Sequence, residues 1–390
     1  MARGFFPLDE RWGLLSTSYS PVLVEAMVRL GARLPFPVVA EEMALLFGVS
    51  VSADTVRRLT EEAGAILAGI EQRELEHLEH EAPEEPEGPP VQQVSADGCM
   101  LSLTDGRWTE VRTIAIGTVV QPEDGDVRAE AISYFSRHGS ADTFVRQATL
   151  PTYERGTRRA GRVAAVMDGA GWLQEVVSEQ CPTAVRILDF PHAVGYLHSA
   201  AHAAFGQDSP AAGEWLDEWV PRFKTGTPEG VLTALRALPT PTEEAATAKG
   251  TAIRYLGSRK EQIRYAAFRE QGLPIGSGMV ESAGKLVVEA RMKGSGMHWA
   301  PRNLNPLLAL RSRLCSGQWE QTWLLMHQQW RQQMRDEQRR KRRERQAQRA
   351  SDTPEPEAEH PPKGPREKTI RDGRPTPAHP WYGHSGIFAA

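Results

Sequence analysis

The 390-residue chain lacks several features that would assign it to common protein classes. It has only three cysteines, Cys99, Cys181 and Cys315, which are far apart and odd in number, so neither a disulfide framework nor a Cys-x-x-Cys zinc pair can form. No apolar run reaches the roughly 18 residues of a membrane span, and the start lacks the apolar core of a signal peptide. These absences argue against secretion, membrane integration and a cysteine-built zinc site, and they favour a reducing cytosol.

An excess of charge of one sign is also lacking, since the formal net charge is only −4. The charges are nevertheless segregated along the chain. Residues 71–90 hold eight Glu and one Arg, whereas residues 331–349 hold nine Arg or Lys and three acids. Because these two blocks nearly cancel, the net charge alone does not exclude a polyanionic partner.

The N-terminal part is predicted to be a helical domain, over residues 1–80. Apolar residues recur there at three- and four-residue spacing, Gly48 interrupts the pattern, and Ser52 or Asp54 can cap the helix that follows. A helix, a short turn and a second helix with arginines are typical of a helix-turn-helix. A plain helical hairpin gives the same pattern, so both interpretations stay open.

Two arginines of that second helix, Arg57 and Arg58, are the candidate DNA contacts of the N-terminal domain. The Glu- and Pro-rich residues 81–91 are expected to be a linker.

Residues 92–315 are predicted to form an α/β domain. Helices are expected over residues 140–158 and 170–179. The predicted strands form a run before the first of these helices and then alternate with helices, which suits a mixed sheet with helices on its faces. Their ranges are Val91–Ala96, Cys99–Leu103, Val111–Val120, Ala131–Phe135, Arg162–Met167 and Ala184–Leu188.

Helical spacing dominates the rest of the chain. We expect a block of helices at about residues 193–272 and a long basic helix over residues 316–350, after a break at Gly317. Trp319, Trp323 and Trp330 lie on roughly one face of that helix, a spacing more typical of a core than of a base-stacking surface. Residues 351–390 are rich in Pro and charge and are expected to be disordered.

Three acids stand out by their positions. Asp97 and Asp168 each follow a predicted strand and precede a glycine, and Glu281 follows a Gly-Ser-Gly turn at the start of a helix. Strand ends of open sheets are where ligands sit, and carboxylates in this arrangement can hold two Mg²⁺ ions for an attack on a phosphodiester. Asp-Gly is also a common turn pair, so spacing alone leaves an ordinary structural role open.

Several segments together resemble insertion-sequence transposases of the ISKra type, in the Mutator-like branch of the DDE superfamily. The resemblance covers about residues 5–315. The segments that carry it are Val94-Ser-Ala-Asp97-Gly-Cys-Met100, Val166-Met-Asp168-Gly-Ala-Gly-Trp172, Ile187-Leu-Asp189-Phe-Pro-His192-Ala193, Ile275-Gly-Ser-Gly-Met-Val-Glu281-Ser282 and Arg291-Met-Lys-Gly-Ser-Gly-Met-His-Trp299.

The resemblance implies an RNase H-like fold, interrupted by an all-helical insertion between the second Asp and the Glu. It also implies that Asp97, Asp168 and Glu281 form a DDE triad holding two Mg²⁺ or Mn²⁺ ions. The spacing agrees, since 71 positions separate the two aspartates and 113 separate Asp168 from Glu281, a gap that contains the predicted helical block. The expected function is a DNA transposase that hydrolyses phosphodiesters at element ends and transfers strands into target DNA.

Asp189 and His192 would match a family signature of Cys or Asp, two residues and His. His192 is then expected near the scissile bond, where it would touch a phosphate or a base or orient a metal ligand, and Asp189 is expected among the DNA contacts. The alternative is that Asp189 simply caps the helix starting at Pro191.

Basic residues after Glu281 and in the basic helix are further candidate DNA contacts, although each group can also be a solvated helix face. They are Arg291, Lys293, His298, Arg339, Arg340, Lys341, Arg342 and Arg343.

The resemblance implies partners and a location as well. The partners are element ends and target DNA, on which the protein acts as a homodimer or larger assembly, without a membrane. The location is the bacterial cytoplasm, in association with the nucleoid.

Relatives often carry a cysteine-rich segment upstream of an aromatic stretch like Arg3–Glu10, so we expect either an omitted start or a truncated copy. Two other functions stay open: a catalytically idle DNA-binding repressor, and an RNase H-like nuclease or resolvase without strand transfer.

Overall fold

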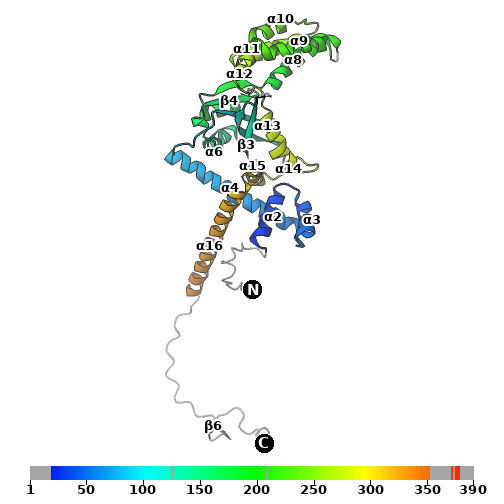
Figure 1. Ribbon diagram of the computed structural model, residues 1–390. Helices are drawn as coiled ribbons and strands as arrows, with labels where there is room; N and C mark the ends of the chain where they lie inside the picture. Colours follow the sequence, from blue (N-terminus) through cyan, green and yellow to red (C-terminus); the bar gives the residue numbers. More distant parts are fainter. Residues whose placement is uncertain (1–18, 124–126, 208, 352–369, 372–373, 378–390) are drawn as a thin grey trace. The chain divides into compact units, whose positions relative to one another are not determined.

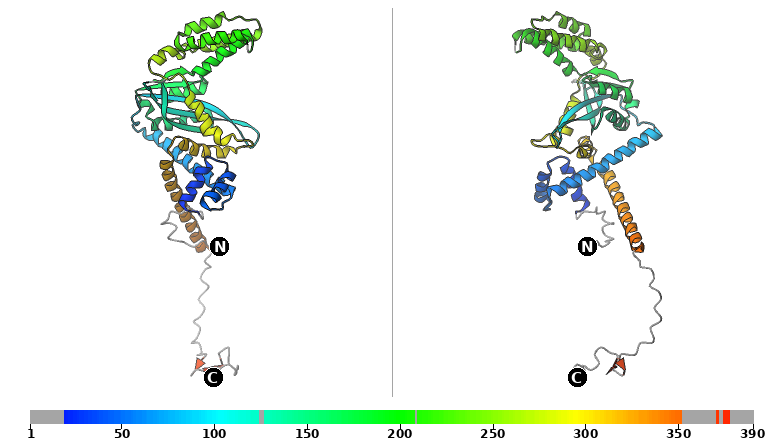
Figure 2. Two further views of the ribbon diagram at one scale, coloured as in Figure 1. Left: turned by 45° about the vertical axis from the view of Figure 1, so that its right-hand side comes forward. Right: turned by 180° about the vertical axis from the view of Figure 1, so that it is seen from behind.

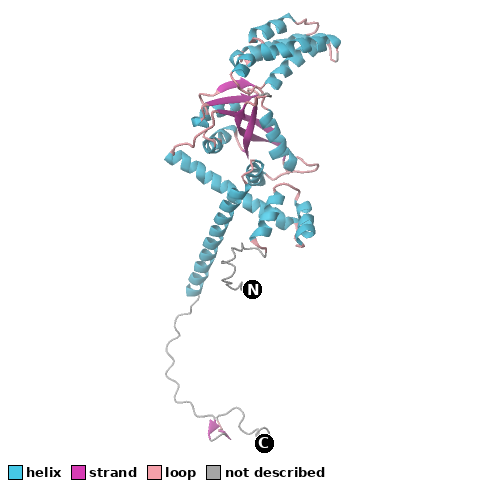
Figure 3. Cartoon of the chain, in the orientation of Figure 1, coloured by secondary structure: helices cyan, strands magenta, loops and turns pink. Residues whose placement is uncertain are grey.

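The computed structural model describes residues 19–123, 127–207, 209–351, 370–371 and 374–377. The chain divides into two compact units, up to Gln332 and from Gln333 on. In the first unit, helices surround one five-stranded sheet (Figure 3). The mixed α/β class expected from the sequence is therefore confirmed.

The sheet has the strand order β3-β2-β1-β4-β5. Neighbours β1, β2 and β3 pair antiparallel, whereas β4 and β5 continue the sheet from β1 in parallel. Three consecutive strands followed by strands alternating with helices match the predicted order, except that the predicted strands Val91–Ala96 and Cys99–Leu103 are one strand, β1. The strands are β1 (Val91–Ser102), β2 (Trp108–Val120), β3 (Arg128–His138), β4 (Arg162–Met167) and β5 (Val185–Leu188).

One prediction about the sheet is wrong: Asp97 does not end a strand. It lies inside β1, where Asp97 pairs with Thr113 and Gly98 pairs with Arg112 of β2. The turn tendency of Asp-Gly is local, and the ladder of hydrogen bonds to the long neighbouring strand outweighs it.

The single helix predicted over residues 140–158 is instead two helices, α5 (Ala141–Gln147) and α6 (Thr149–Glu154), followed by the one-turn η1 (Thr157–Arg159).

Each face of the sheet is covered by helices. One face packs on α5 and on α7 (Gly171–Gln180) through a cluster that includes Val94, Ala96, Ile114 and Leu173. The opposite face carries Ala115, which packs on Met279, Val280 and Ala283 of α13 (Gly278–Ala283). Residues alternate between faces along a strand, so Ser95 and Asp97 lie on the α13 face.

The outer edge of the sheet is protected by α15 (Pro301–Cys315). Side chains from this helix and the turn after it accept hydrogen bonds from alternate backbone N–H groups of β3. The pairs are Asn305 Oδ1 with His138 at 2.7 Å, Ser312 Oγ with Ser136 at 3.0 Å and Ser316 Oγ with Tyr134 at 2.9 Å. An edge strand that would otherwise expose unpaired donors is thereby satisfied.

The N-terminal helices are α2 (Pro21–Gly31), α3 (Phe36–Phe47) and α4 (Ala53–Glu81). Gly48 ends α3 with φ +63°, and the Ser52 hydroxyl accepts from Thr55 N at 3.1 Å at the start of α4, as the sequence predicts. These helices belong to the same compact unit as the sheet. Helix α4 also crosses α15 so closely that a Cβ on Gly64 would lie 2.2 Å from the Pro306 carbonyl oxygen.

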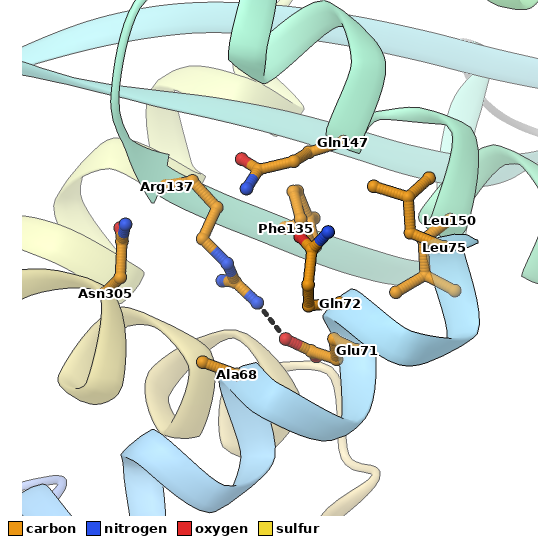
Figure 4. Close-up of a pocket in the computed structure, with 9 residues that line it drawn as sticks. All are labelled: Ala68, Glu71, Gln72, Leu75, Phe135, Arg137, Gln147, Leu150 and Asn305. Carbon is orange, nitrogen blue, oxygen red and sulfur yellow. Dashed lines mark hydrogen bonds and ion pairs between the residues drawn. The ribbon is translucent and has the colours of Figure 1, made fainter.

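A chain of buried charges joins α4 to the sheet and to α15. The Arg137 guanidinium of β3 is ion-paired with Glu71 of α4, and Arg313 Nε lies 2.9 Å from the other oxygen of Glu71. Arg313 also pairs with Glu154 of α6 at 2.7 Å. Figure 4 shows this Arg137–Glu71 pair on the wall of a cavity of about 190 Å³, whose lining also includes Gln147.

The acidic segment between α4 and β1 is docked rather than a free linker. Arg159 pairs with Glu84 at 2.6 Å and with Glu87 at 2.8 Å, and the Tyr153 hydroxyl donates to the Glu84 carbonyl at 3.2 Å. Gly88 passes so close to Gly156 that a Cβ there would lie 2.3 Å from the Gly156 carbonyl oxygen.

The expected block of helices follows β5. It leaves the sheet at Asp189 and returns at Ile275, and these ends meet where Phe190 N donates to Ile275 O at 2.9 Å. In both views of Figure 2 its helices form one group beyond the sheet, and Figure 1 labels its α-helices. They are α8 (Phe190–Phe205), α9 (Pro210–Thr225), α10 (Pro228–Ala237), α11 (Glu243–Gly257), η2 (Lys260–Gln262) and α12 (Tyr265–Glu270).

Helix α13 continues through a π-helical turn, η3 (Gly284–Glu289), into α14 (Ala290–Met292). The buried Arg311 of α15 supports this turn, because its guanidinium donates to the carbonyl groups of Leu286 and Val287. Irregular backbone just after Glu281 is thus satisfied by a side chain rather than left unpaired.

The predicted basic helix is α16 (Trp319–Ser351), which follows a break at Gly317 with φ +72°. Trp319, Trp323 and Trp330 are buried, which confirms their core role. Most of the expected disordered tail and the stretch Arg3–Glu10 lie outside the described residues, although β6 (Ile370–Arg371) and β7 (Arg374–Pro375) form a short antiparallel pair. Among the described residues, no helix meets the length and apolarity needed for a membrane span.

Candidate functional site

Asp97 and Asp168 are brought level by the register of the sheet. Val94 of β1 and Ala165 of β4 form the last pair of this parallel ladder, and Asp97 and Asp168 each lie three residues beyond it. The charge of Asp168 raises the pKa of Asp97, so the two carboxylates are neighbours. Residues at the same level of parallel strands point to the same face. The two aspartates therefore share the α13 face of the sheet.

Glu281 reaches the same face from α13. The helix begins after the Gly276–Ser277 turn, and its apolar residues Met279, Val280 and Ala283 pack on Ala115 of β2. Its packing brings Glu281 close enough to Asp97 for the Glu281 charge to raise the pKa of Asp97.

The electrostatics of Asp97 agrees with this proximity. The pKa of Asp97 is raised, chiefly because the carboxyl group is largely buried, and the charges of Asp168, Glu110 and Glu281 raise it further. A hydrogen bond from Gly98 N at 2.7 Å opposes the shift. The site thus concentrates negative charge around a partly desolvated carboxylate, which a bound cation would relieve.

The three carboxylates do not converge as a ready-made metal cage. In the described part of the chain, no three His, Cys, Asp or Glu side chains form a group able to hold a metal ion. Each acid has a local partner instead: Asp97 accepts from Gly98 N, Asp168 Oδ1 accepts from Ala170 N at 2.9 Å, and Glu281 pairs with Lys285 at 2.7 Å. Their hard oxygen donors suit Mg²⁺ or Mn²⁺, and the Glu281 side chain, which is 67% exposed, has room to turn toward the aspartates.

The two Asp-Gly pairs differ in what their glycines do. Gly169 follows the end of β4 and adopts φ +86°, a left-handed conformation that favours glycine. Gly98 makes no turn; its missing side chain leaves room for Glu110, whose Oε1 would lie 2.1 Å from a Cβ at Gly98. Glu110 is a fourth acid near Asp97 that sequence reasoning missed, because only the β1–β2 pairing brings it there.

Asp189 is a buried cap, and its expected contact with DNA is wrong. The register that pairs Met167 with Leu188 brings Asp189 level with Asp168 on the next strand. Both carboxylate oxygens are occupied: Oδ2 accepts from His192 N at 2.9 Å, and Oδ1 accepts from Ser277 N at 2.6 Å. Asp189 therefore starts α8 and also holds the turn that precedes Glu281, while remaining only 6% exposed.

Gln93 holds the same turn from the other side and was not predicted from the sequence. Its side-chain Nε2 donates to the Gly276 carbonyl at 2.9 Å and to the Ser95 hydroxyl at 3.1 Å. Gln93, Ser95 and Asp97 are alternate residues of one strand, so they lie on the same face of the sheet. This spacing is the signal that could have identified Gln93.

His192 lies beside Asp168 as part of an aromatic group from the helical insertion. Its Nε2 is 3.4 Å from the Tyr255 hydroxyl, which donates to the Asp168 carbonyl, and Arg259 Nη2 donates to the Gly169 carbonyl at 3.2 Å. Burial raises the pKa of Tyr255 to about 12, so its hydroxyl stays a donor. Sequence reasoning missed Tyr255 and Arg259, which carry no motif of their own.

Arg291 does not face DNA, and that prediction is wrong. It is 3% exposed, its Nε donates to the Gly31 carbonyl at 3.0 Å, and its guanidinium lies over the rings of Phe36 and Trp299. Burial lowers its pKa to about 10. Arg291 therefore fastens α14 to the C-terminal end of α2, where the helix dipole favours a cation.

The other two basic residues of this region are at the surface. Lys293 pairs with Glu289 at 2.7 Å, and Cys99 Sγ lies 3.6 Å from the same Glu289 oxygen. The exposed His298 shares a hydrogen bond with Ser102 Oγ at 2.8 Å. Both stay accessible near the Asp97 strand.

The remaining candidate DNA contacts are partly neutralised by acids on their own helices. Arg57 pairs with Asp54 and Glu61, and Arg58 lies 3.8 Å from Glu62. On α16, the exposed basic residues are interleaved with acids, and some of them form pairs one turn apart. The predicted contacts on this helix are Arg339, Arg340, Lys341, Arg342 and Arg343.

Comparison with known proteins gives a family without an assigned activity. No curated protein matches the sequence. A family model does match, over residues 17–329, which include the sheet, the helical insertion and all three acids. The chain belongs to the family described as Uncharacterised protein family (UPF0236).

Proposed function

We propose that the chain is a DNA transposase that hydrolyses phosphodiesters at the ends of an insertion sequence and joins the freed ends to target DNA. The observation that supports this best is the register of β1 and β4, which brings Asp97 level with Asp168 on the face that α13 covers with Glu281. A mixed sheet with an all-helical insertion between Asp168 and Glu281 is consistent with an RNase H-like catalytic domain.

In this proposal Asp97, Asp168 and Glu281 hold two Mg²⁺ or Mn²⁺ ions. Such ions, when bound, activate a water and stabilise charge on the phosphodiester oxygens. In this proposal the role of the protein is to position the ligands of the ions. The sheet would hold the two aspartates, and the Gly276–Ser277 segment would orient the helix that carries Glu281. His192 would lie beside the Asp168 backbone. Binding would require Glu281 to exchange Lys285 for the ions.

DNA is the proposed partner, as element ends and target, with the protein acting as a homodimer or larger assembly in the bacterial cytoplasm at the nucleoid. Lys293 and His298, which are exposed near the strand that carries Asp97, are proposed to touch DNA near the cut. Sequence-independent phosphate contacts are proposed for the basic run of α16 and for Arg57 and Arg58.

The test is cleavage of duplex DNA containing the genomic sequence that flanks the gene. Asp97→Asn, Asp168→Asn and Glu281→Gln should each abolish Mg²⁺-dependent cleavage while leaving DNA binding and melting temperature close to wild type. Asp217→Asn, at an exposed position of α9, is the matched control and should cleave normally. Near-wild-type cleavage by any one of the three variants contradicts that residue's role.

A catalytically idle DNA-binding repressor is the second candidate. The observation in its favour is that each acid has a local partner and none of the described acids forms a metal-ready group. Wild-type protein that binds the flanking DNA but cleaves it with neither Mg²⁺ nor Mn²⁺ would establish this alternative. Cleavage without joining to a second duplex would instead indicate a nuclease or resolvase.

A further inference from the structure

The turn that carries Asp168 is held from outside the sheet. Asp168 and Gly169 lie in the loop between β4 and α7, and both of their carbonyl groups accept hydrogen bonds from one stretch of the helical insertion. Tyr255, near the end of α11, donates its hydroxyl to the Asp168 carbonyl, and Arg259, two residues past that helix, donates Nη2 to the Gly169 carbonyl at 3.2 Å. These hydrogen bonds join residues 87 and 90 positions apart in the chain.

Tyr255 is itself immobilised on both faces of its ring. Tyr196 of α8 stacks on one face with ring centroids 4.2 Å apart and planes 16° apart. The Arg259 guanidinium lies over the ring, 3.9 Å from its centroid, and Arg259 Nη1 donates to the Tyr255 carbonyl at 3.3 Å. A ring enclosed in this way is a poor platform for a nucleobase, and its free function is the hydroxyl directed at Asp168.

The Asp168–Gly169 loop lies outside the ladder of hydrogen bonds between β4 and β5. Gly169 at φ +86° has no side chain to restrict the peptide, and Asp168 lies one residue past the last β4–β5 pair. The direction of the Asp168 carboxylate follows the orientation of this backbone, through its own bond to Ala170 N. Fixing two carbonyl groups therefore fixes the carboxylate.

We infer that Tyr255 and Arg259 are positioning residues that orient the Asp168 carboxylate for metal binding, so that the helical insertion helps to build the metal site. This inference rests on the proposed function. Neither residue is assigned contact with the reacting atoms; both act through the Asp168–Gly169 backbone.

The experiment titrates Mn²⁺ into the full-length protein by electron paramagnetic resonance, without DNA. Tyr255→Phe, which removes only the hydroxyl, should weaken Mn²⁺ binding about tenfold while the melting temperature changes by no more than a few degrees. Arg259→Gln should weaken it similarly. The matched controls are Tyr153→Phe, whose hydroxyl also donates to a backbone carbonyl but far from the acids, and Arg254→Gln, an exposed arginine of α11.

A second arm separates positioning from general loosening. In an Asp168→Asn background, Tyr255→Phe should cause no further loss of Mn²⁺ affinity, because its effect passes through that carboxylate. Equal losses in both backgrounds would overturn the inference, as would unchanged Mn²⁺ binding by Tyr255→Phe.

The two proposals fail differently. If Asp168→Asn weakens the binding of Mn²⁺ by the protein but Tyr255→Phe does not, only the positioning role is wrong. If wild type binds no Mn²⁺, or Asp168→Asn binds it as tightly as wild type, both the metal site and its positioning residues are wrong.

Discussion

At the scale of single residues, Asp189 does two structural tasks with one carboxylate. One oxygen caps α8 and the other holds the turn before α13, so the start of the helical insertion and the start of the Glu281 helix share one anchor. The signature Asp-x-x-His thus has a physical explanation in this protein. The Asp and the His192 backbone form the cap, and the His ring reaches the Tyr255 group.

Replacing Asp189 tests this dual anchor. Asp189→Asn has one acceptor oxygen where two N–H donors need partners, so one donor is left buried and unsatisfied. We expect a loss of about 2 kcal/mol in the free energy of unfolding, measured by urea denaturation. Asp217→Asn, at an exposed helical position, should change it by less than about 0.5 kcal/mol. Equal stability of the two variants would contradict the dual anchor.

The candidate site was partly predictable residue by residue. Asp168 follows a strand and Glu281 lies at the start of a helix, as predicted, whereas Asp97 was selected for a strand end that does not exist. The role of Arg291 was not predicted, because a cation near an acid in sequence says nothing about which surface it packs on; its burial depends on Phe36 and Trp299 from distant segments.

Tyr255 and Glu110 show the same limit. Their relation to Asp168 and Asp97 exists only through tertiary packing and strand pairing, and nothing in their local sequence marks it.

At the scale of elements, the edge of the sheet depends on α15. Two hydroxyl groups and one amide group, from α15 and the turn after it, accept hydrogen bonds from β3 as a neighbouring strand would. Because these acceptors already bind the N–H groups of β3, that edge of the sheet is not free to pair with another strand.

Ser312→Ala isolates one of these bonds. It leaves the buried Ser136 N–H without its acceptor, so we expect the free energy of unfolding to fall by about 2 kcal/mol. The comparison is Ser199→Ala, in which an exposed serine of α8 loses a bond to a carbonyl of its own helix. Chemical denaturation measures both, and a destabilisation by Ser312→Ala no larger than that by Ser199→Ala would show that the edge is not held in this way.

The basic run of α16 makes a prediction about DNA. Changing all five of its clustered cations to Gln should weaken binding to a random-sequence duplex and reduce the slope of log affinity against log salt by about 0.9 for each phosphate that is no longer neutralised. The residues are Arg339, Arg340, Lys341, Arg342 and Arg343.

Fluorescence anisotropy at several salt concentrations provides the measurement. The control makes the same change in charge at five exposed cations of the helical insertion: Arg222, Arg254, Lys260, Arg264 and Arg269. If the control lowers the slope as much as the α16 variant does, the effect is one of net charge and α16 has no special role.

Elements were more predictable than their limits. The succession of strands and helices along the chain, the helical block and the break at Gly317 follow from periodicity and glycine positions. The unbroken β1 does not, because pairing with β2 overrides a local turn signal at Asp97. The docking of the acidic segment also escapes prediction, since Arg159, which pairs with Glu84, lies 75 positions away.

At the scale of the whole molecule, the buried charges of Glu71, Arg137, Arg313 and Glu154 connect four elements in the first unit. The two arginines lie close together, and the carboxylates between and beside them make their burial tolerable. Through these buried ion pairs, α4 packs directly against the sheet and is part of the same folded unit.

Glu71→Gln tests how much the molecule depends on these charges. It leaves two buried arginines without the shared negative charge, and we expect a loss of about 3 kcal/mol in the free energy of unfolding. Glu74→Gln, at an exposed position of the same helix, should be nearly neutral. Guanidinium denaturation can mask charge effects, so urea is the denaturant of choice; equal stability of the two variants would mean that the buried charges are dispensable.

The hydrogen bond between Phe190 and Ile275 has a consequence for how this molecule could change in size. Because the helical insertion departs and returns at adjacent points, its length is geometrically uncoupled from the spacing of the strands. A larger or smaller group of helices could occupy the same gap without moving Asp97, Asp168 or the turn before Glu281. The limit on such exchange would be functional rather than spatial: any substitute would have to supply its own donors to the two carbonyl groups that Tyr255 and Arg259 now hold.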